Sequence, residues 1–310
     1  MGGKKRICDE GEGVWLGSSG LIMMILVVQC LTSIGSVSAA AQIPAMFIFG
    51  DSLIDVGNNN YLGSLAKSNY YPYGCDFRAG PTGRFSNGRT VVDMLGNLLG
   101  LPYVPPFADP NTTGTRILWG VNYASAAAGI LDETGQHFGQ RYSLSQQVLN
   151  FETTLDQLRR MMSGANMTQY LAKSIAVLEA SAQPGRCMDY VNQILGSFNE
   201  GLRSLANQLN TNHPGAIFVY ANTYAAFGDM LNNPALYGFS VIDRGCCGIG
   251  RNRGQITCLP YLVPCANRNQ YIFWDAYHPT EAANAVLAWR AFNGPPSDCY
   301  PINVQQMALI

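Results

Sequence analysis

The chain has 310 residues and a formal net charge of −1, with 47% hydrophobic and 13% charged residues. This size and balance fit one globular domain. The lack of a basic excess removes the electrostatic basis for nucleic-acid binding, so no nucleic-acid partner is expected.

The first 41 residues have the pattern of a secretory signal peptide. A positive n-region at 4–6 precedes an apolar h-region at 21–31, and small residues at 38–41 offer a cleavage site. A membrane anchor is the alternative, but the apolar run is too short to span a bilayer comfortably. We therefore expect a mature, secreted domain at 42–310, without a stable membrane span.

The residues after this leader carry two features that suit a secreted protein, cysteines and glycosylation sequons. In an oxidising compartment the cysteines are expected to form disulfides. They are Cys75, Cys187, Cys246, Cys247, Cys258, Cys265 and Cys299. Zinc is the alternative at 246–265, but that segment lacks paired C-x-x-C units and a nearby histidine, so no metal is expected. Asn111 and Asn166 begin sequons and are candidate glycosylation sites.

Hydrophobic patterning in the domain alternates between short strands and longer helices. The expected elements are strand 45–49, helix 90–99, strand 117–124, helix 143–162, strand 174–178, helix 189–209, strand 216–220 and helix 279–292. Pro279 suits the first turn of the last helix. This alternation favours an α/β fold in which helices cover both faces of a parallel sheet. Ligands in such folds bind beyond the carboxyl ends of the strands, and Ser52 follows the first strand.

A serine hydroxyl becomes a nucleophile when a base takes its proton, and that base is usually a histidine oriented by a carboxylate. The chain contains three histidines, His137, His213 and His278. His278 alone has a carboxylate at short fixed spacing, Asp275 in "FWDAYHPT". A tight turn there would bring the carboxylate to Nδ1 and leave Nε2 to face Ser52. Ser52, Asp275 and His278 are therefore the candidate catalytic residues.

Several long motifs follow one another in a fixed order. They are "GDSL" at 50–53, "PTGRFSNGRTVVD" at 81–93, "GVNYASAAAGIL" at 120–131, "NNPALYGF" with "GCCGIGRNRGQITCLP", and "WDAYHPTEAAN". On these residues the chain resembles the plant GDSL esterases/lipases of the SGNH hydrolase superfamily, from about residue 44 to the C-terminus. The resemblance implies a three-layer α/β/α sandwich with a mostly parallel sheet. It also implies cofactor-free hydrolysis of lipid or other carboxylic esters through an acyl-enzyme, with Ser52 as nucleophile, His278 as base and Asp275 as its orienting acid.

The resemblance implies three donors for the oxyanion as well: the backbone N–H of Ser52, a small residue of "ASAAAG" and an asparagine side chain. We expect Gly129 to be the second donor, with Ala127 as the alternative. The third donor is missing, because "EASAQPGRC" follows "SIAVL" where the family carries Gly-x-Asn-Asp, and Asn-Asp occurs nowhere in the chain. Compared with the family, a block with one strand and one cysteine is absent. The sheet is therefore expected to be one strand short, with Cys187 left without a partner.

The missing donor leaves two functions open. Loss of one oxyanion donor typically slows an enzyme by about two to three orders of magnitude. The chain is then either a secreted ester hydrolase impaired by the missing block, or a catalytically weak secreted protein that binds acyl or acetylated ligands. The natural substrate, the acyl-chain preference and the oligomeric state do not follow from the sequence.

Structural roles are the alternative for several of these residues. Ser52 could cap a helix beginning at the next residue, and Asp275 with His278 could cap the last helix. The asparagines at 58–60 are expected to supply turn geometry. Two aromatic residues could line an acyl pocket or fill the core: Phe273 and Trp274.

Overall fold

The computed structural model describes residues 43–179, 189–213 and 217–310, which belong to one compact unit, Ala41–Ile310. The predicted signal peptide at 1–41 and Cys187 lie outside the described residues.

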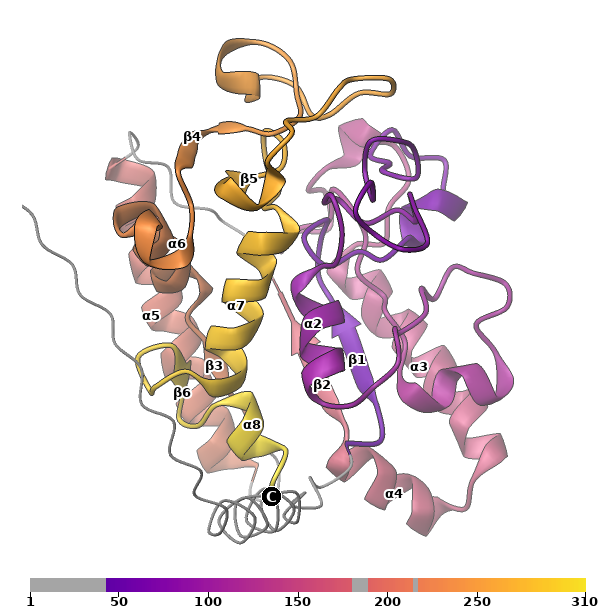
Figure 1. Cartoon of the computed structure of the whole chain (residues 1–310). Helices are drawn as coiled ribbons and strands as arrows, with labels where there is room; N and C mark the ends of the chain where they lie inside the picture. The colour runs from indigo at the N-terminus through magenta and orange to yellow at the C-terminus, as the bar shows by residue number, and fades with distance from the viewer. Residues whose placement is uncertain (1–42, 180–188, 214–216) are drawn as a thin grey trace, which may run out of the picture. The chain divides into compact units, whose positions relative to one another are not determined.

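Helices and short strands alternate along this unit, as an α/β fold requires (Figure 1). The strands are β1 (Met46–Phe49), β2 (Ile175–Leu178), β3 (Tyr220–Ala221), β4 (Val241–Gly245), β5 (Tyr271–Phe273) and β6 (Cys299–Tyr300). The α-helices are α2 (Val91–Leu98), α3 (Leu144–Met161), α4 (Gly164–Lys173), α5 (Asp189–Asn212), α6 (Thr223–Asn232), α7 (Glu281–Asn293) and α8 (Val304–Met307). The α/β class is confirmed, and β1, β2, α2, α3 and α5 lie within a few residues of their predicted bounds.

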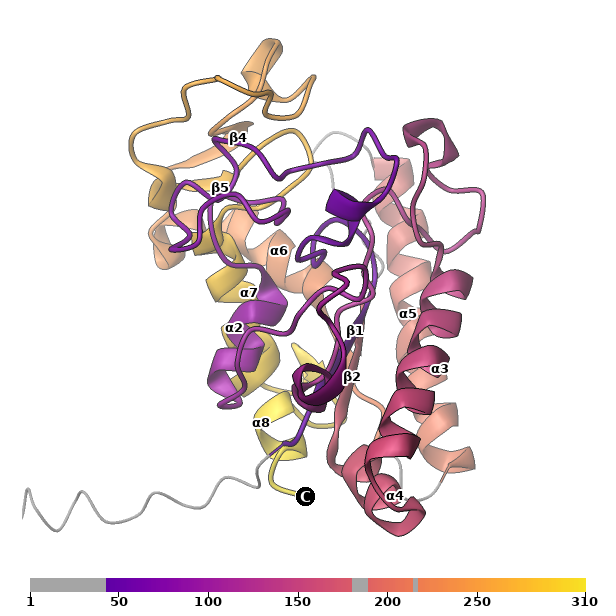
Figure 2. The same ribbon diagram turned by 90° about the vertical axis from the view of Figure 1, so that its right-hand side faces the viewer.

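The β1 strand is buried on both faces, and this fixes where its carboxyl end emerges. It pairs in parallel with β2, and all four of its residues are buried. Met46 and Ile48 pack in a cluster with Val92 of α2, whereas Phe47 and Phe49 pack with residues of α3. Figure 2 shows α2 and α3 on opposite sides of β1 and β2. The layers expected around the sheet are therefore present at this strand.

The sheet itself is divided among the described residues. β1 pairs with β2 and β4 with β5 in parallel, while β3 pairs with β6 in antiparallel orientation. The strand predicted at 216–220 as part of a parallel sheet was wrong for the described residues 217–219, which form no strand, and for Tyr220, which belongs to the antiparallel β3. Within the described chain β2 has no neighbour besides β1, and Leu178 at its end is 69% exposed. An uncovered edge of this kind is what a missing strand would leave.

The predicted strand at 117–124 was also wrong in its first half. A 3₁₀ helix, η2 (Gly114–Trp119), occupies that half, and only the residues after it run beside β1. There Ile48 donates its N–H to the Val121 carbonyl at 3.1 Å, and Tyr123 donates to the Ile48 carbonyl at 2.7 Å. Gly120 divides the two halves with φ +103°, and a Cβ there would lie 2.0 Å from the Met46 carbonyl oxygen. The backbone at Gly120 passes so close to β1 that only glycine fits at this position. The 3₁₀ helix η2 ends here.

The last helix begins later than predicted. Thr280 is its N-cap, and its side chain accepts a hydrogen bond from the Ala283 N–H, so α7 starts at Glu281. Pro279 therefore precedes the helix and forms a bridge with Phe273. The turn that contains Asp275 and His278 therefore precedes the helix, and its side chains are not part of the helix.

Candidate active site

Ser52, Asp275 and His278 come together in the order that nucleophilic catalysis needs. The Nε2 atom of His278 lies 2.8 Å from the Ser52 hydroxyl, although 226 residues separate them in the chain. Its Nδ1 atom lies 2.8 Å and 2.9 Å from the two carboxylate oxygens of Asp275. Both contacts are within hydrogen-bond range, so the imidazole connects the hydroxyl to the carboxylate. His137 and His213 are exposed and take no part in this cluster.

A tight turn after β1 presents Ser52. Asp51 accepts hydrogen bonds from the Leu53 N–H at its side chain, 2.9 Å, and from the Asp55 N–H at its carbonyl, 3.0 Å. No helix begins here, so Ser52 is not a helix cap. Gly50 opens the turn with φ +156°, and a Cβ on it would lie 2.7 Å from the Glu179 carbonyl oxygen. The turn therefore requires glycine before the nucleophile.

The Asp275–His278 segment is a closed turn. The backbone N–H groups of Tyr277 and His278 both donate to Asp275 Oδ1 at 2.8 Å. The Trp274 N–H donates to the His278 carbonyl at 2.7 Å and closes the base of the turn. Because Thr280 caps α7, the capping alternative for Asp275 and His278 does not hold.

Asp275 is buried yet ionised. Burial by itself would raise the pKa of its carboxyl, but the neighbouring His278 and the accepted hydrogen bonds hold that pKa below its usual value. One of these bonds comes from the hydroxyl of Tyr73, 2.5 Å from Oδ2 and 202 residues away in the chain. Sequence reasoning missed Tyr73, because no spacing or motif links "YYPYGCDF" to the catalytic acid.

Aromatic side chains restrict the imidazole. The ring of Phe85 lies with its centroid 4.9 Å from that of His278.

Trp274 is fully buried, which assigns it to the core instead of an acyl pocket, and Phe273 packs in a hydrophobic cluster with Phe227. Phe273 is only partly buried, but its ring packs against Phe227 in that cluster.

The segment around Gly129 runs beside the nucleophile turn. Ser125 donates its N–H to the Gly50 carbonyl at 3.1 Å, and a turn follows in which Ala128 donates to the Ser125 carbonyl at 3.0 Å. Ala127 inside this turn has φ +67°, a conformation that side chains rarely adopt and that often accompanies a functional site. Within the described part of the chain, no group accepts a hydrogen bond from the N–H of Ser52, Ala127 or Gly129. These N–H groups remain available to a ligand.

Asparagine amides tie the surrounding loops together. Asn58 donates to the carbonyls of Asn122 and Ala124, at 2.9 and 2.8 Å. Asn59 donates to the Ala126 carbonyl at 3.0 Å. Their amides bind backbone carbonyls of the 120–131 segment, which agrees with the structural role expected of residues 58–60.

Glu179 follows β2, in the region where the family places its oxyanion asparagine. Its N–H donates to the Phe49 carbonyl at 2.9 Å and extends the pairing with β1. Burial, and next the charge of Asp51, raise the pKa of the Glu179 carboxyl well above its usual value, and the two side chains share a hydrogen bond. This carboxyl is thus engaged by Asp51 beside the nucleophile turn.

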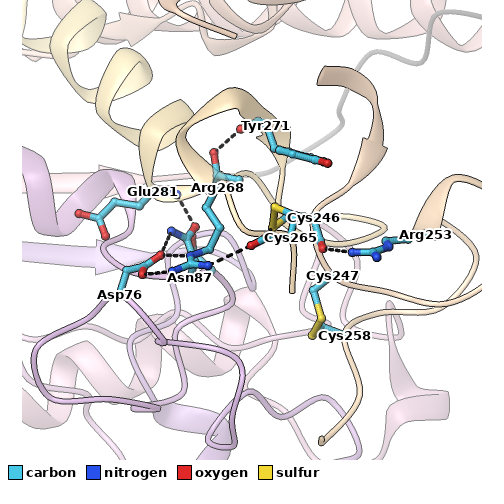
Figure 3. The surroundings of a disulfide bond; sticks show 12 residues. Asp76, Asn87, Cys246, Cys247, Arg253, Cys258, Cys265, Arg268, Tyr271 and Glu281 are labelled. Carbon is cyan, nitrogen blue, oxygen red and sulfur yellow. Dashed lines mark hydrogen bonds and ion pairs between the residues drawn. A yellow bond between two sulfur atoms is a disulfide. The ribbon is translucent and has the colours of Figure 1, made fainter. Parts of the chain in front are cut away.

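Two disulfides brace the segment before the catalytic acid (Figure 3). Cys246 pairs with Cys265 and Cys247 with Cys258, so the predicted disulfides are present in this segment. The Cys247 N–H donates to the Trp274 carbonyl at 2.7 Å, next to Asp275. The prediction of disulfides at Cys75 and Cys299 was wrong in the described chain, where both are free thiols, because the four cysteines of 246–265 pair among themselves.

Arg268 joins this braced segment to the loops after β1. Figure 3 shows Asp76, Asn87 and Arg268 side by side. The Arg268 guanidinium donates to both carboxylate oxygens of Asp76, at 2.5 and 2.8 Å, and to the Cys265 carbonyl.

The described residues hold no group of three or more His, Cys, Asp or Glu side chains placed for a metal.

Comparisons with known proteins agree with this geometry. A family model described as GDSL-like Lipase/Acylhydrolase matches residues 46–163 and 138–290. GDSL esterase/lipase At1g71250 of Arabidopsis thaliana is 50% identical over 364 residues, covering 96% of this chain and 97% of that protein. GDSL esterase/lipase At5g08460 of the same plant is 46% identical, covering 88% and 89%. GDSL esterase/lipase 7 is 42% identical, covering 86% and 92%.

The alignment with At1g71250 is longer than the part of this chain that it contains. An alignment of 364 positions contains 96% of this chain, about 298 residues, so about 66 positions of At1g71250 have no counterpart here. That length is sufficient for a strand and a helix together with their loops. With a matching family model over most of its length and relatives this similar, the chain belongs to the GDSL-like lipase/acylhydrolase family.

Proposed function

We propose that this protein is a carboxylic ester hydrolase that works through an acyl-enzyme, on lipid or other esters. The observation that carries the proposal is the 2.8 Å contact between His278 Nε2 and the Ser52 hydroxyl, with Asp275 behind the imidazole. The names of its relatives, esterase/lipase, agree with this chemistry.

The reaction proceeds in two halves. The Ser52 oxygen attacks the ester carbonyl carbon while its proton passes to His278 Nε2. The protonated imidazole then gives that proton to the leaving alcohol, and the acyl group stays on Ser52. A water molecule, deprotonated by His278, attacks the acyl-enzyme, and the imidazolium returns a proton to Ser52 as the acid leaves. Asp275 keeps Nδ1 protonated and stabilises the imidazolium throughout.

The oxyanion is held by backbone N–H groups in this proposal. Ser52 supplies one donor and Gly129 the second, with Ala127 as the alternative, and the lack of an acceptor for these three N–H groups among the described residues supports it. The asparagine of the family is missing, so turnover is expected to be about two to three orders of magnitude below that of a complete relative.

The proposal also includes secretion. The leader pattern at 1–41, the two disulfides and the exposed sequon asparagines Asn111 and Asn166 support a secreted glycoprotein. Within 43–179, 189–213 and 217–310, none of the helices combines the length and hydropathy that crossing a bilayer requires.

The alternative function is ligand binding without efficient catalysis, and the absence of the Gly-x-Asn-Asp block favours it. One cavity of about 190 Å³ is lined by residues of α5, β3 and β6, among them Arg203 and Tyr300, but by no residue of the triad. This cavity therefore does not supply a substrate cleft for Ser52.

A fluorophosphonate probe distinguishes the two functions, because it reacts with an activated hydroxyl and not with a pocket. We expect covalent labelling of the full secreted protein at Ser52, and slow hydrolysis of p-nitrophenyl butyrate that Ser52→Ala abolishes. Absence of labelling at Ser52, with acyl ligands still bound, would overturn the hydrolase proposal and leave the binding protein.

A further inference from the structure

We infer that Tyr73 is a positioning residue of the triad: its hydroxyl donates to Asp275 Oδ2 and fixes the orientation of the carboxylate from outside the catalytic turn. This inference rests on the proposed hydrolase function and names a residue that acts through Asp275.

The first observation is the geometry of the contact. The Tyr73 hydroxyl lies 2.5 Å from Asp275 Oδ2, the short distance typical of an O–H group that donates to a charged oxygen. Tyr73 is 1% exposed. Its ring meets those of Tyr70, Phe85 and Trp274 at centroid distances of 5.4, 5.8 and 6.1 Å. The phenol has little room to move, so it holds the carboxylate in one orientation.

The second observation is how the carboxylate distributes its contacts. Oδ1 accepts the backbone N–H groups of Tyr277 and His278, both from within the turn. Oδ2 accepts the Tyr73 hydroxyl and shares the His278 Nδ1–H at 2.9 Å. Among the described residues, Tyr73 is thus the one donor to Oδ2 that does not come from the catalytic turn. Without the hydrogen bond from Tyr73, the Asp275 Oδ2 atom would carry more negative charge, which would stabilise the imidazolium of His278. The carboxylate would also be free to rotate.

The third observation links this contact to the braced segment. Tyr73 packs in one hydrophobic cluster with Cys247 and Cys258, the two cysteines of the second disulfide. Burial, and then the Asp275 charge, raise the pKa of Tyr73 well above its usual value, so the phenol stays protonated and donates. The titratable groups that act on the Tyr73–Asp275 pair are His278 and Tyr70.

Tyr73→Phe tests this role, and Tyr70→Phe is the matched control. The Tyr70 hydroxyl donates to the Cys258 carbonyl at 2.8 Å, so the control removes a hydroxyl from the same loop without touching Asp275. For Tyr73→Phe we expect kcat to fall about tenfold with KM within about twofold, as for loss of one hydrogen bond to a charged group. We also expect the acid limb of the kcat/KM profile to move to higher pH by about half a unit, because Asp275 then stabilises the imidazolium more strongly. The control should leave that limb in place.

The inference would be overturned if the acid limb of the kcat/KM profile of Tyr73→Phe coincided with that of the wild type, whatever the change in melting temperature. If Tyr73→Phe does not fold, Tyr73→Met replaces it, because this variant also removes the hydroxyl, and it should move the limb in the same direction. The downfield proton resonance of His278 Nδ1–H provides a readout independent of turnover: Tyr73→Phe should shift it and Tyr70→Phe should not. If the wild type is not labelled at Ser52, the proposed function fails, whereas an unmoved resonance refutes the role of Tyr73.

Discussion

Gln147 on α3 holds both backbone groups of Gly50, the residue that opens the nucleophile turn. Its side-chain oxygen accepts the Gly50 N–H and its amide nitrogen donates to the Gly50 carbonyl, each at 2.8 Å. Gln147 is fully buried and lies 97 residues from its partner. A helix on one face of β1 therefore fixes the position of the turn that carries Ser52.

Replacing this amide should destabilise the protein as well as the site. Gln147→Leu would leave the N–H of buried Gly50 without a partner and deprive its carbonyl of this donor, so we expect a loss of about 2 to 4 kcal/mol in the free energy of unfolding. Urea denaturation of the wild type and variant measures it. The control is Gln146→Leu at the exposed neighbouring position, which should change stability far less. Equal losses in both variants would contradict the role of Gln147.

The catalytic acid should be needed for its charge. Asp275→Asn preserves the size of the side chain but removes the acceptor that keeps Nδ1 of His278 protonated, so the imidazole adopts the wrong tautomer. We expect the rate of Ser52 labelling by fluorophosphonate to fall by about three to four orders of magnitude. Circular dichroism spectra of the two proteins serve as the control for folding. A variant that is labelled within tenfold of the wild type would show that Asp275 does not orient the base.

The disulfide nearest the catalytic acid should contribute both stability and activity. Cys247–Cys258 closes a segment with a sequence separation of 11, which corresponds to about 2 to 3 kcal/mol of loop entropy. Cys247→Ser with Cys258→Ser should lower the unfolding free energy by that amount and slow hydrolysis, since the Cys247 N–H donates to the carbonyl of Trp274, the residue before Asp275. Cys75→Ser, at a free thiol, is the matched control. Melting temperature and ester hydrolysis should both stay near wild type in that control.

Asp55 should make stability depend on pH. Burial raises its pKa to about 6, against the lowering effect of the Gly57, Ala126 and Asn58 N–H groups that it accepts. The folded protein then binds more protons than the unfolded chain between about pH 4 and 6, so stability falls as pH rises through that window and levels off above it. A pKa raised from 3.8 to about 6 corresponds to about 3 kcal/mol.

Asp55→Asn is the comparison that isolates this group. The stability advantage of wild type over variant should shrink by about 3 kcal/mol between pH 4 and pH 7, measured by urea denaturation at each pH. An advantage that stays constant across this range would show that Asp55 titrates alike in the folded and unfolded chain.

Local patterns in the sequence predicted the parts of the fold that local physics determines. The apolar run before Gly50 identified β1, because a strand buried on both faces is apolar throughout. The helical spacing of 143–162 identified α3, because burial of one stripe of a helix leaves a periodic pattern. Motif order identified Ser52, Asp275 and His278, and the structure brings them together. The role of Gly129 stays a prediction.

The remainder depends on contacts between distant segments. Gly120 divides a predicted strand because it passes close to Met46, and nothing beside Gly120 in the chain announces that neighbour. Likewise nothing in the neighbouring sequence marks Tyr73, which lies in a turn, or Gln147, which lies on α3, before the fold brings them to Asp275 and Gly50. Such contacts leave no periodic signal, so single-sequence reasoning cannot find them.

The edge of β2 that no described strand covers has a consequence for handling this protein. Backbone groups on the side away from β1 can accept a strand from another chain, and Leu178 adds an apolar side chain at that position. As a result, the yield of unassociated protein should fall as the protein concentration rises, whether or not the protein is catalytically active. Dilute, cold preparations should retain monomers. Concentrated preparations should lose monomers through pairing of β2 edges between chains.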